Sequence, residues 1–381
     1  MATSDTELLS KARRFLQELQ APFVGREEEA LVIALALLTR EHAVLIGEPG
    51  TAKSAIARRA AQLVQARFFK YLLTKFTEPS ELFGPLDISA LREGVYRRVT
   101  KGKLPEAEIA FLDEIFNANS AVLNALLSIL QERILYDGYT EIHVPLWSMI
   151  SASNRVPDEP ELEALYDRLL FRHNVRPLEE DLWDKLLDAA WEIERTGLQA
   201  AEPIMSMDDL REYNKLIFSV DLSRVRGPLL RLFVALRERK IHLTDRRKGK
   251  TLKAIAAHAL LNGRLVATED DLVVLKYIAP RDLDDFEKVE IIIREEVKTK
   301  ERILRELSEI EANIRSIEVM VERAREFDPR LVEYSKSLRV ARNRVESLAR
   351  SVEDQEVERE ASRLIEEIER LMDLIAYKLN L

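Results

Sequence analysis

The sequence predicts an α/β fold in which a parallel sheet is followed by an all-helical region and a long helical tail. Three observations lead to this prediction. Short apolar runs alternate with helical stretches early in the chain, which is the pattern of a parallel sheet covered by helices. All eleven glycines lie at or before Gly263, and the last proline is Pro329. Beyond residue 281 the 381-residue chain is charged, periodic and almost free of helix-breaking residues.

The expected strands are short apolar runs that stop at glycine or at polar residues, as buried parallel strands do. Helices with one apolar face separate these runs. The extended segment Tyr136–Leu146 contains Asp137-Gly138, a dipeptide typical of hairpins. We expect strands at Ala43–Ile46, Phe68–Leu73, Ile109–Leu112 and Trp147–Ala152, and helices at Ser54–Gln65 and Ser120–Gln131.

The pattern becomes helical after residue 177. Apolar residues recur there at spacings of three and four, which is typical of helices with one buried face. We therefore predict an α/β core at 1–177 and a separate all-helical domain at 178–281. The helical stretches are Leu182–Glu194, Met207–Phe218, Leu229–Arg239, Leu252–Leu261 and Glu269–Tyr277.

Residues 282–381 form the third predicted domain, a coiled-coil or helical-bundle tail. Apolar residues follow alternating steps of three and four from Leu307 to Ala324 and again from Leu331 to Ile375. Asp328-Pro329 separates the two runs, and the phase shifts near residues 353–356. The heptads favour a coiled coil, and the proline favours an antiparallel hairpin with arms of roughly 60–75 Å. The phase shift permits a compact helical bundle as the alternative.

The composition argues against several classes of protein. A formal net charge of −9 is unfavourable for tight nucleic-acid binding, although a local basic stripe is compatible with it. The chain has no cysteine, hence no disulfide and no thiolate metal site. The longest apolar run, Ala30–Leu38, is too short to cross a bilayer. Residues 1–14 lack the apolar region of a secretory signal, so we expect a cytoplasmic protein.

The segment after the first expected strand has the composition of a phosphate-binding loop that opens a helix. Backbone N–H groups and the helix N-terminus surround phosphate oxygens in such loops. We expect Lys53 to reach the β- and γ-phosphates of ATP, and Ser54 to bind Mg²⁺. Ala52 stands where the general pattern has glycine, and it fits if its φ angle is negative. The predicted nucleotide-binding residues here are Gly47, Glu48, Pro49, Gly50, Thr51, Ala52, Lys53, Ser54 and Ala55.

Polar side chains follow two later strands. Asp113 and Glu114 come directly after the apolar run Ile109–Leu112, and Asn154 follows the next strand. Ligands of open α/β sheets bind where the strands end. We expect Asp113 to hold Mg²⁺ through its water shell, and Glu114 to take a proton from the attacking water or orient it. Asn154 is expected to contact the γ-phosphate or that water, its alternative being a turn residue.

With these residues the sequence resembles the MoxR family of AAA+ ATPases, and most of all its RavA (regulatory ATPase variant) branch. The resemblance spans roughly residues 20–280 and does not obviously include the tail. Alanine before the loop lysine is usual in this family. The segments that carry the resemblance are Val24–Glu27, Gly47–Ser54, Glu81–Leu86, Gly102–Glu108, Phe111–Glu114, Ala152–Asn154 and Leu162–Arg168.

The resemblance implies a ring, usually a homohexamer, with ATP at the interfaces between subunits. Arg168 matches the family's arginine finger, which reaches the γ-phosphate of the neighbouring subunit. Arg246 matches the second sensor arginine of the helical lid, with Arg247 as a near alternative. Val24 and Gly25 resemble the motif that lies against the adenine. The segment Leu86–Lys101 and the hairpin Tyr136–Leu146 resemble inserts that normally point toward the central pore.

Three functions are compatible with this sequence. The first is a chaperone-like machine that remodels or matures a protein client, and the resemblance suggests a partner with a von Willebrand factor A domain. The second is a nucleic-acid-dependent motor, for which Arg97, Arg98, Lys101 and Lys103 could form a basic rim, although the acidic net charge argues against it. The third is a scaffold in which the nucleotide only stabilises the fold. The complete set of expected catalytic side chains weighs against the third.

Overall fold

The computed structural model describes residues 3–137, 140–196, 201–297, 300–325, 328–349 and 355–379. The chain forms two compact units. The first comprises Met1–Ala267 and Val273–Ile293, and the second comprises Thr268–Leu272 and Arg294–Leu381. No helix within the described ranges is both long and apolar enough to cross a membrane.

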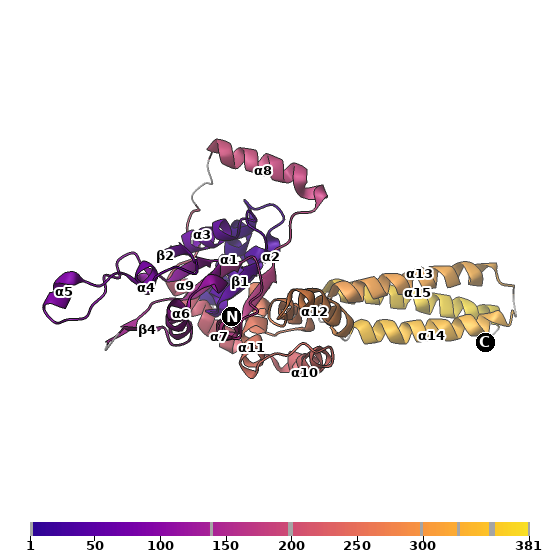
Figure 1. Ribbon diagram of the computed structural model, residues 1–381. Helices are drawn as coiled ribbons and strands as arrows, with labels where there is room; N and C mark the ends of the chain where they lie inside the picture. Colours follow the sequence, from indigo (N-terminus) through magenta and orange to yellow (C-terminus); the bar gives the residue numbers. More distant parts are fainter. Residues whose placement is uncertain are drawn as a thin grey trace. The chain divides into compact units, whose positions relative to one another are not determined.

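A five-stranded parallel sheet lies at the centre of the first unit (Figure 1). Its strand order is β2-β3-β6-β1-β7, so β1 lies between β6 and β7. Every residue of β1 and β6 is buried, which explains why these strands read as continuous apolar or small-residue runs without alternation. The four predicted strands are confirmed. The strands are β1 (Ala43–Ile46), β2 (Phe68–Leu72), β3 (Ile109–Asp113), β6 (Ser148–Ser153) and β7 (Phe171–Asn174).

Strand β7 was not expected from the sequence because three of its four residues are polar. Arg172 is nevertheless buried. It donates to the carbonyls of Pro280 and Tyr166 at 2.8 Å each, and its guanidinium lies 3.6 Å from the centre of the Tyr166 ring. These partners are distant in sequence from the strand, so the local pattern could not reveal them.

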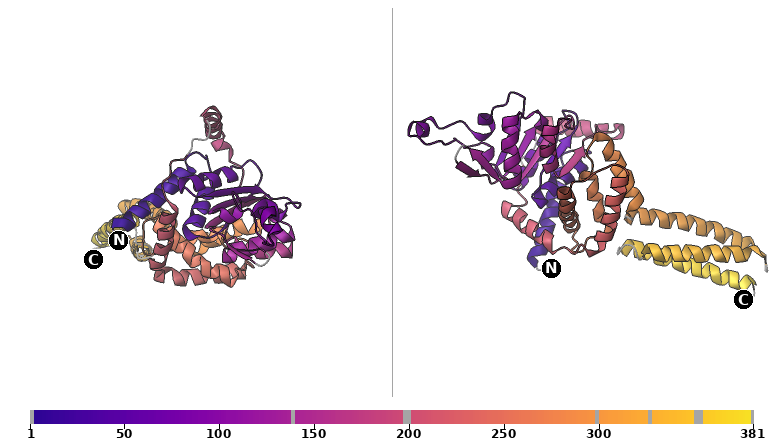
Figure 2. Two further views of the ribbon diagram at one scale, coloured as in Figure 1. Left: turned by 90° about the vertical axis from the view of Figure 1, so that its left-hand side faces the viewer. Right: turned by 60° about the horizontal axis from the view of Figure 1, so that its bottom comes forward.

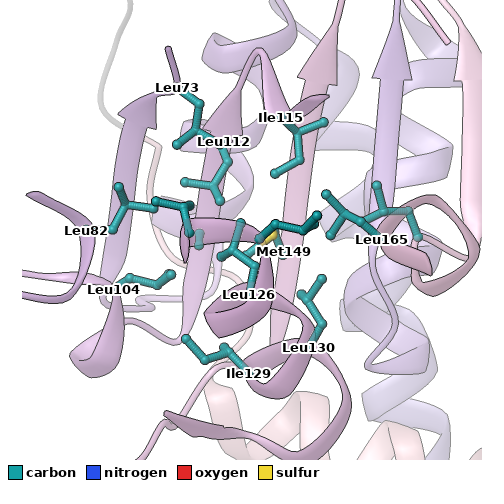
Figure 3. Packing of buried hydrophobic residues seen from close by; sticks show 14 of the residues in the cluster. Leu73, Leu82, Leu104, Leu112, Ile115, Leu126, Ile129, Leu130, Met149 and Leu165 are labelled. Carbon is teal, nitrogen blue, oxygen red and sulfur yellow. The ribbon is translucent and has the colours of Figure 1, made fainter. Parts of the chain in front are cut away.

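Helices cover both faces of the sheet and build the main core (Figure 3). Leu112 and Met149 of the sheet pack against Leu126 and Ile129 of α6. Helix α2 is buried along nearly its whole length, which accounts for the apolar run that the sequence shows there. The helices of this part are α1 (Thr3–Gln20), α2 (Glu27–Thr39), α3 (Lys53–Leu63), α4 (Pro79–Phe83), α5 (Ile88–Arg92), α6 (Ser120–Glu132) and α7 (Pro160–Arg168).

Two inserts extend from the same side of the sheet domain (Figure 1). One carries α5, and the other is the antiparallel pair β4 (Ile134–Asp137) and β5 (Thr140–His143). The expected hairpin is therefore present, while Gly138 of its turn signal lies outside the described residues. Arg98 of the first insert donates to Asp137 of the second at 2.9 Å, and Asp137 is buried. This ion pair joins the two inserts.

The helical region that follows contains the predicted helices with one correction. Residues 269–277 form a 3₁₀-helix, not an α-helix. Among its buried side chains, Leu272 and Leu275, and likewise Val274 and Tyr277, are three residues apart, which suits the three-residue turn of a 3₁₀-helix. The helices are α8 (Trp183–Thr196), α9 (Met207–Leu216), α10 (Ser223–Glu238), α11 (Asp245–Leu261) and α12 (Leu283–Glu296).

Helix α12 belongs mostly to the first unit, although the sequence pattern assigned it to the tail. Its Phe286 is buried in the same core as the sheet. The first unit accordingly extends to Ile293. The boundaries drawn at residues 177 and 281 stay predictions.

The tail is a bundle of three helices, α13 (Lys300–Arg323), α14 (Arg330–Ala349) and α15 (Gln355–Leu379), each packed on the other two (Figure 2). Leu307, Leu338 and Leu364 are buried in its core at heptad positions. The favoured two-helix hairpin is thus replaced by the compact bundle, because the second heptad run is two helices. Helix α13, with 24 residues, spans about 36 Å. Residues 353 and 354, in the phase shift, lie outside the described residues.

Candidate functional site

The expected phosphate loop connects β1 to α3 at the edge where the parallel strands end. The Gly47 N–H donates to the Ser153 carbonyl at 2.9 Å, which fixes the start of the loop against β6. A Cβ atom on Gly47 would lie 2.4 Å from the Val175 carbonyl oxygen, so this position requires glycine. The sequence pattern therefore forms a loop of defined geometry, closely packed on both neighbouring strands.

Ala52 corrects one expectation. Its φ angle is +61°, in the left-handed region, whereas the sequence argument required a negative angle. An alanine there has a steric cost of about 1–2 kcal/mol from its Cβ atom. The conformation places Ala52 at the N-cap of α3 and turns the chain into the helix at Lys53.

Ala52→Gly should raise the free energy of unfolding by about 0.5–1 kcal/mol, because the relieved strain exceeds the extra entropy that glycine gains in the unfolded chain. The control Ala55→Gly, inside α3, should lower it by about 1 kcal/mol. Urea titrations of both variants measure the difference. If both variants lose stability alike, Ala52 does not adopt the left-handed conformation.

Lys53 is only 8% exposed, and its ammonium lies within the loop. It donates to the carbonyls of Gly47 and Glu48 at 2.9 and 2.6 Å, and to Thr51 Oγ1 at 3.0 Å. Burial lowers the pKa of Lys53, and the nearby carboxylates Asp113 and Glu114 oppose this shift. A buried cation held by loop oxygens is suited to exchange them for phosphate oxygens.

Asp113 and Glu114 lie at the same edge of the sheet. Asp113 ends β3, and its Oδ1 accepts the Glu114 N–H at 3.1 Å. Glu114 has a φ angle of +51°, a strained conformation for a non-glycine residue. Such strain concentrates at functional sites, where it aims a side chain. The structure therefore brings both carboxylates near Lys53, as the sequence predicts.

Asn154 directly follows β6, whose Ser153 pairs with Ile46 of β1. This register places Asn154 beside the start of the phosphate loop, and its side chain is exposed. The next residue, Arg155, was not singled out from the sequence. Its guanidinium donates to both Glu159 oxygens at 3.1 Å, and Glu114 is among the charges that raise the pKa of Arg155.

The donor set at this edge fits Mg²⁺. Ser54 lies in the first turn of α3, and Asp113 ends β3. Mg²⁺ prefers hard oxygen ligands and is usually bound by one or two protein groups together with waters and substrate phosphates. The described residues contain no cluster of three or more His, Cys, Asp or Glu side chains able to hold an ion. An ion here would therefore depend on a bound phosphate.

A cavity of about 340 Å³ opens next to the loop. Among its lining residues are Gly25, His173, Asn174, Leu178 and Tyr277. Asn174 ends β7 and pairs with Ile46, directly before the loop. Gly25 lines the cavity as the adenine motif would, whereas Val24 is not among the lining residues.

One feature of this cavity was missed at the sequence level. The buried Arg26 donates to Glu29 Oε1 at 2.9 Å and to the Arg176 carbonyl at 2.8 Å. Arg26 also contributes to lowering the pKa of Lys53, so it lies near the loop. The available signal was a charged pair three residues apart at the start of an otherwise apolar helix.

Arg168 lies at the opposite edge of the sheet. It ends α7, three residues before Phe171, the first residue of β7. Phe171 pairs with Ala43, where β1 begins, and the phosphate loop follows Ile46, where β1 ends. Four residues of strand span about 13 Å. Arg168 is therefore separated from the phosphate loop of its own chain by the length of the sheet.

The Arg168 side chain is only partly engaged. It donates to the Ala164 carbonyl at 2.8 Å and to Gln131 Oε1 at 2.5 Å. Its Nε atom is buried and has no hydrogen-bond partner among the described residues. Burial and the nearby Arg246 lower the pKa of Arg168.

Arg246 and Arg247 differ in their surroundings. Arg246 is exposed and pairs with Asp167 at 3.3 Å, which places it beside Arg168. Arg247 is buried and donates to the carbonyls of Leu169 at 2.9 Å, Leu170 at 2.7 Å and Ile278 at 3.2 Å. Burial holds the pKa of Arg247 well below its usual value. Arg247 thus connects α11 to the segment before β7, while Arg246 presents its charge at the surface.

Arg247→Ala should lower the free energy of unfolding by about 3 kcal/mol, because it leaves buried carbonyls without donors. Arg246→Ala removes an exposed pair and should cost less than about 1 kcal/mol. Denaturant titrations of the two neighbouring variants provide a matched comparison. Equal stabilities would show that Arg247 does not brace the fold.

Comparisons with known proteins agree with this geometry. Residues 10–215 match the family model described as the MoxR domain in the MoxR-vWA-beta-propeller ternary systems, and residues 228–293 match the AAA lid domain. Two uncharacterized proteins of Methanocaldococcus jannaschii are each 41% identical to this chain, covering 75% of both chains in one case, and 74% of this chain and 73% of the relative in the other.

Two further likenesses are more distant. The chaperone MoxR1 of Mycobacterium tuberculosis is 29% identical over 42% of this chain and 43% of its own length. The crystal structure of a protein from Cytophaga hutchinsonii superposes with a TM-score of 0.63 at 20% identity, covering 76% of this chain and 95% of that one, and so shares the fold. The first family model alone spans more than half of the chain. This chain belongs to the MoxR family of AAA+ ATPases.

Proposed function

We propose that this chain hydrolyses ATP with Mg²⁺ in a homohexameric ring and uses the cycle to remodel or mature a protein client. One observation carries the proposal. The phosphate loop, Asp113 and Glu114 lie at one edge of the sheet, and Arg168 with Arg246 lies at the other. This separation supports a nucleotide site whose two halves come from different chains, as a head-to-tail ring requires.

The first half of the site binds the nucleotide and activates the attacking water. Loop N–H groups and Lys53 hold the phosphates, Ser54 and Asp113 hold the metal ion, and Asn154 positions the γ-phosphate or the water. Bound Mg²⁺ would neutralise charge that develops on the phosphates. Glu114 accepts a proton from the water. The cavity beside Gly25 takes the adenine, because it lies next to the loop through Asn174 and Ile46.

The second half belongs to the neighbouring subunit. Arg168 and Arg246 both stabilise charge on the phosphate bound by that neighbour. The geometry supports a joint role because Asp167 pairs with Arg246 and accepts from Thr244 Oγ1 at 2.9 Å, holding the start of α11 beside α7. The assignment favours Arg246 over Arg247 as the lid sensor, since the carbonyls around Arg247 occupy its donors.

Client contact is assigned to the two inserts. Ile88, Leu91 and Val95 of the first insert and Tyr136 of the second are exposed apolar or aromatic side chains. Exposed apolar groups of this kind are typical of binding surfaces. The finer assignments, a von Willebrand factor A partner and the RavA branch, rest on the family description and on the sequence resemblance.

The nucleic-acid motor loses support. Of the four cations expected to form a basic rim, Arg97 pairs with Asp87 at 2.7 Å and Arg98 pairs with Asp137. Lys103 donates to the Glu81 carbonyl at 2.9 Å. Cations that are already engaged contribute less to phosphate binding along a strand.

A test follows from the division of the site. ATP turnover per chain should rise with chain concentration, because a complete site needs two chains, and native mass spectrometry with ATP should show six copies. Turnover that is constant per chain down to concentrations where only monomers are detected would contradict the proposal. Addition of single-stranded DNA should not stimulate the rate, and salt-sensitive stimulation would instead favour the motor.

A further inference from the structure

Helix α8 exposes an apolar face that no other element covers within the described part of the chain. None of its residues is buried. Leu186 and Leu187 follow Trp183 by three and four residues, and Trp191 follows Leu187 by four, so these side chains lie on one side of the helix. Leu187 is 69% and Trp191 is 75% exposed. An exposed stripe with two tryptophans is typical of an interface, because tryptophan is enriched among residues that dominate binding energy.

A matching groove lies between α10 and the segment leading into α11. Leu230, Phe233, Val234 and Arg237 form one stripe of α10, and Ile241 and Leu243 are also among the residues lining the groove. The groove has a volume of about 270 Å³, and Leu230 is 64% exposed at its rim. Five of its eight lining residues are apolar, which suits the apolar face of an amphipathic helix.

The two surfaces carry opposite charge. Residues 179–196, which include α8, contain seven carboxylates and two cations, a net charge of −5. Residues 223–248, which include the groove, contain nine cations and two carboxylates, a net charge of +7. One of these cations, Arg247, is buried and bonded, and the excess persists without it. Complementary potentials of this kind steer association and fix register.

We propose that α8 of one copy lies in the α10 groove of the next copy in the ring. This inference rests on the proposed ring. Figures 1 and 2 show α8 and α10 on different sides of the first unit, so each chain offers the helix to one neighbour and the groove to another. A contact between two unlike surfaces is heterologous, and it closes when the rotation between copies closes.

The charges also indicate the direction of the helix. Glu194 lies three residues after Trp191 and continues the apolar stripe of α8 at its C-terminal end. Arg237 lies three residues after Val234 and ends the groove stripe in the same way. Both side chains are exposed. A parallel arrangement of α8 and α10 brings this pair together, whereas an antiparallel one separates it.

A membrane surface is a poorer occupant for α8. Helices that lie in membrane interfaces carry cations on their polar face, which anionic lipids attract. The net negative charge around α8 has the opposite sign. A second copy is a better occupant, because the positive charge around its groove attracts the negative charge around α8.

The absence of native cysteine allows a direct test. Chains carrying Leu187→Cys are mixed with chains carrying Val234→Cys in ATP and treated with a short bismaleimide. A cross-linked pair should form at least tenfold more than when Phe218→Cys, exposed elsewhere on the helical region, replaces the groove variant. Yield equal to that control, or cross-linking only within a chain that carries both cysteines, would overturn the proposal.

Charge reversal provides a second measurement. Glu194→Arg on the α8 chain, or Arg237→Glu on the groove chain, should each reduce cross-linking at least fivefold, and combining the two should restore it. Unchanged yield in either single reversal would contradict the parallel arrangement. Each variant should keep the parent's unfolding midpoint, since the changes are at exposed positions.

The outcomes separate the two proposals. A ring that hydrolyses ATP without the cross-link removes the α8 contact and leaves the proposed function. A cross-link between chains that never assemble into a ring leaves the contact and removes the proposed function.

Discussion

Glu114→Gln is expected to bind ATP normally and to lose turnover by about 10²–10⁴-fold. The amide keeps the size and polarity of the side chain but cannot accept a proton from water. The strained backbone at Glu114 and its charge coupling to Lys53 place this carboxylate beside the phosphate loop. Phosphate release measures the loss, and a fluorescent ATP analogue measures the retained binding.

Asp113→Asn is the matched control for that experiment. It changes the neighbouring carboxylate in the same way and should weaken binding of ATP with Mg²⁺, because Asp113 is assigned to the metal ion. Unchanged hydrolysis in Glu114→Gln would remove Glu114 from the proton-accepting role. A trapped, ATP-loaded Glu114→Gln ring would also be suited to capture the client.

Arg168→Ala should assemble normally and hydrolyse ATP about 10³–10⁵-fold more slowly, the range found for arginine fingers. The side chain is partly buried and its Nε atom has no partner among the described residues, so its removal should cost little stability. The variant lacks the positive charge that would stabilise the transition state bound by the neighbouring chain. The rate per assembled ring, with assembly verified by native mass spectrometry, gives the effect.

Mixing distinguishes action on the neighbour from action within one chain. Lys53→Ala chains still supply Arg168, and Arg168→Ala chains still supply a phosphate loop. In a random equal mixture about one interface in four combines the intact halves. Activity should therefore return in the mixture although each variant alone is inactive. A mixture that exchanges subunits and stays inactive would place Arg168 and the loop in the same chain's site.

Much of the first half of the site could be predicted because its residues follow strands in sequence. Asp113 ends β3, Asn154 directly follows β6, and Lys53 follows β1 after the loop; parallel strands end at one edge. The angle at Ala52 could not be predicted, since alanine has no preference for a positive φ.

The second half depends on distant contacts. Arg246 meets Asp167, 79 residues away, and nothing in the local sequence around either residue indicates the pair. The resemblance to the family singled out Arg168 and Arg246 but did not indicate that they lie close together. Helix α12 is similar: its charge and periodicity match the tail, yet Phe286 packs in the core of the first unit. The positions of these residues depend on burial in the tertiary structure, which the local sequence periodicity does not reveal.

The ion pair between Arg98 and the buried Asp137 has a consequence for how ATP hydrolysis would act on a client. The two inserts leave the chain at separate places, one after β2 and the other after α6, yet this pair joins them. In the proposed ring the two inserts of each subunit would then form one rigid client-binding surface. Ile88 and Tyr136 would move together in each conformational change. The ratio of client displacement to ATP consumed would depend on that joint, while the hydrolysis rate would not.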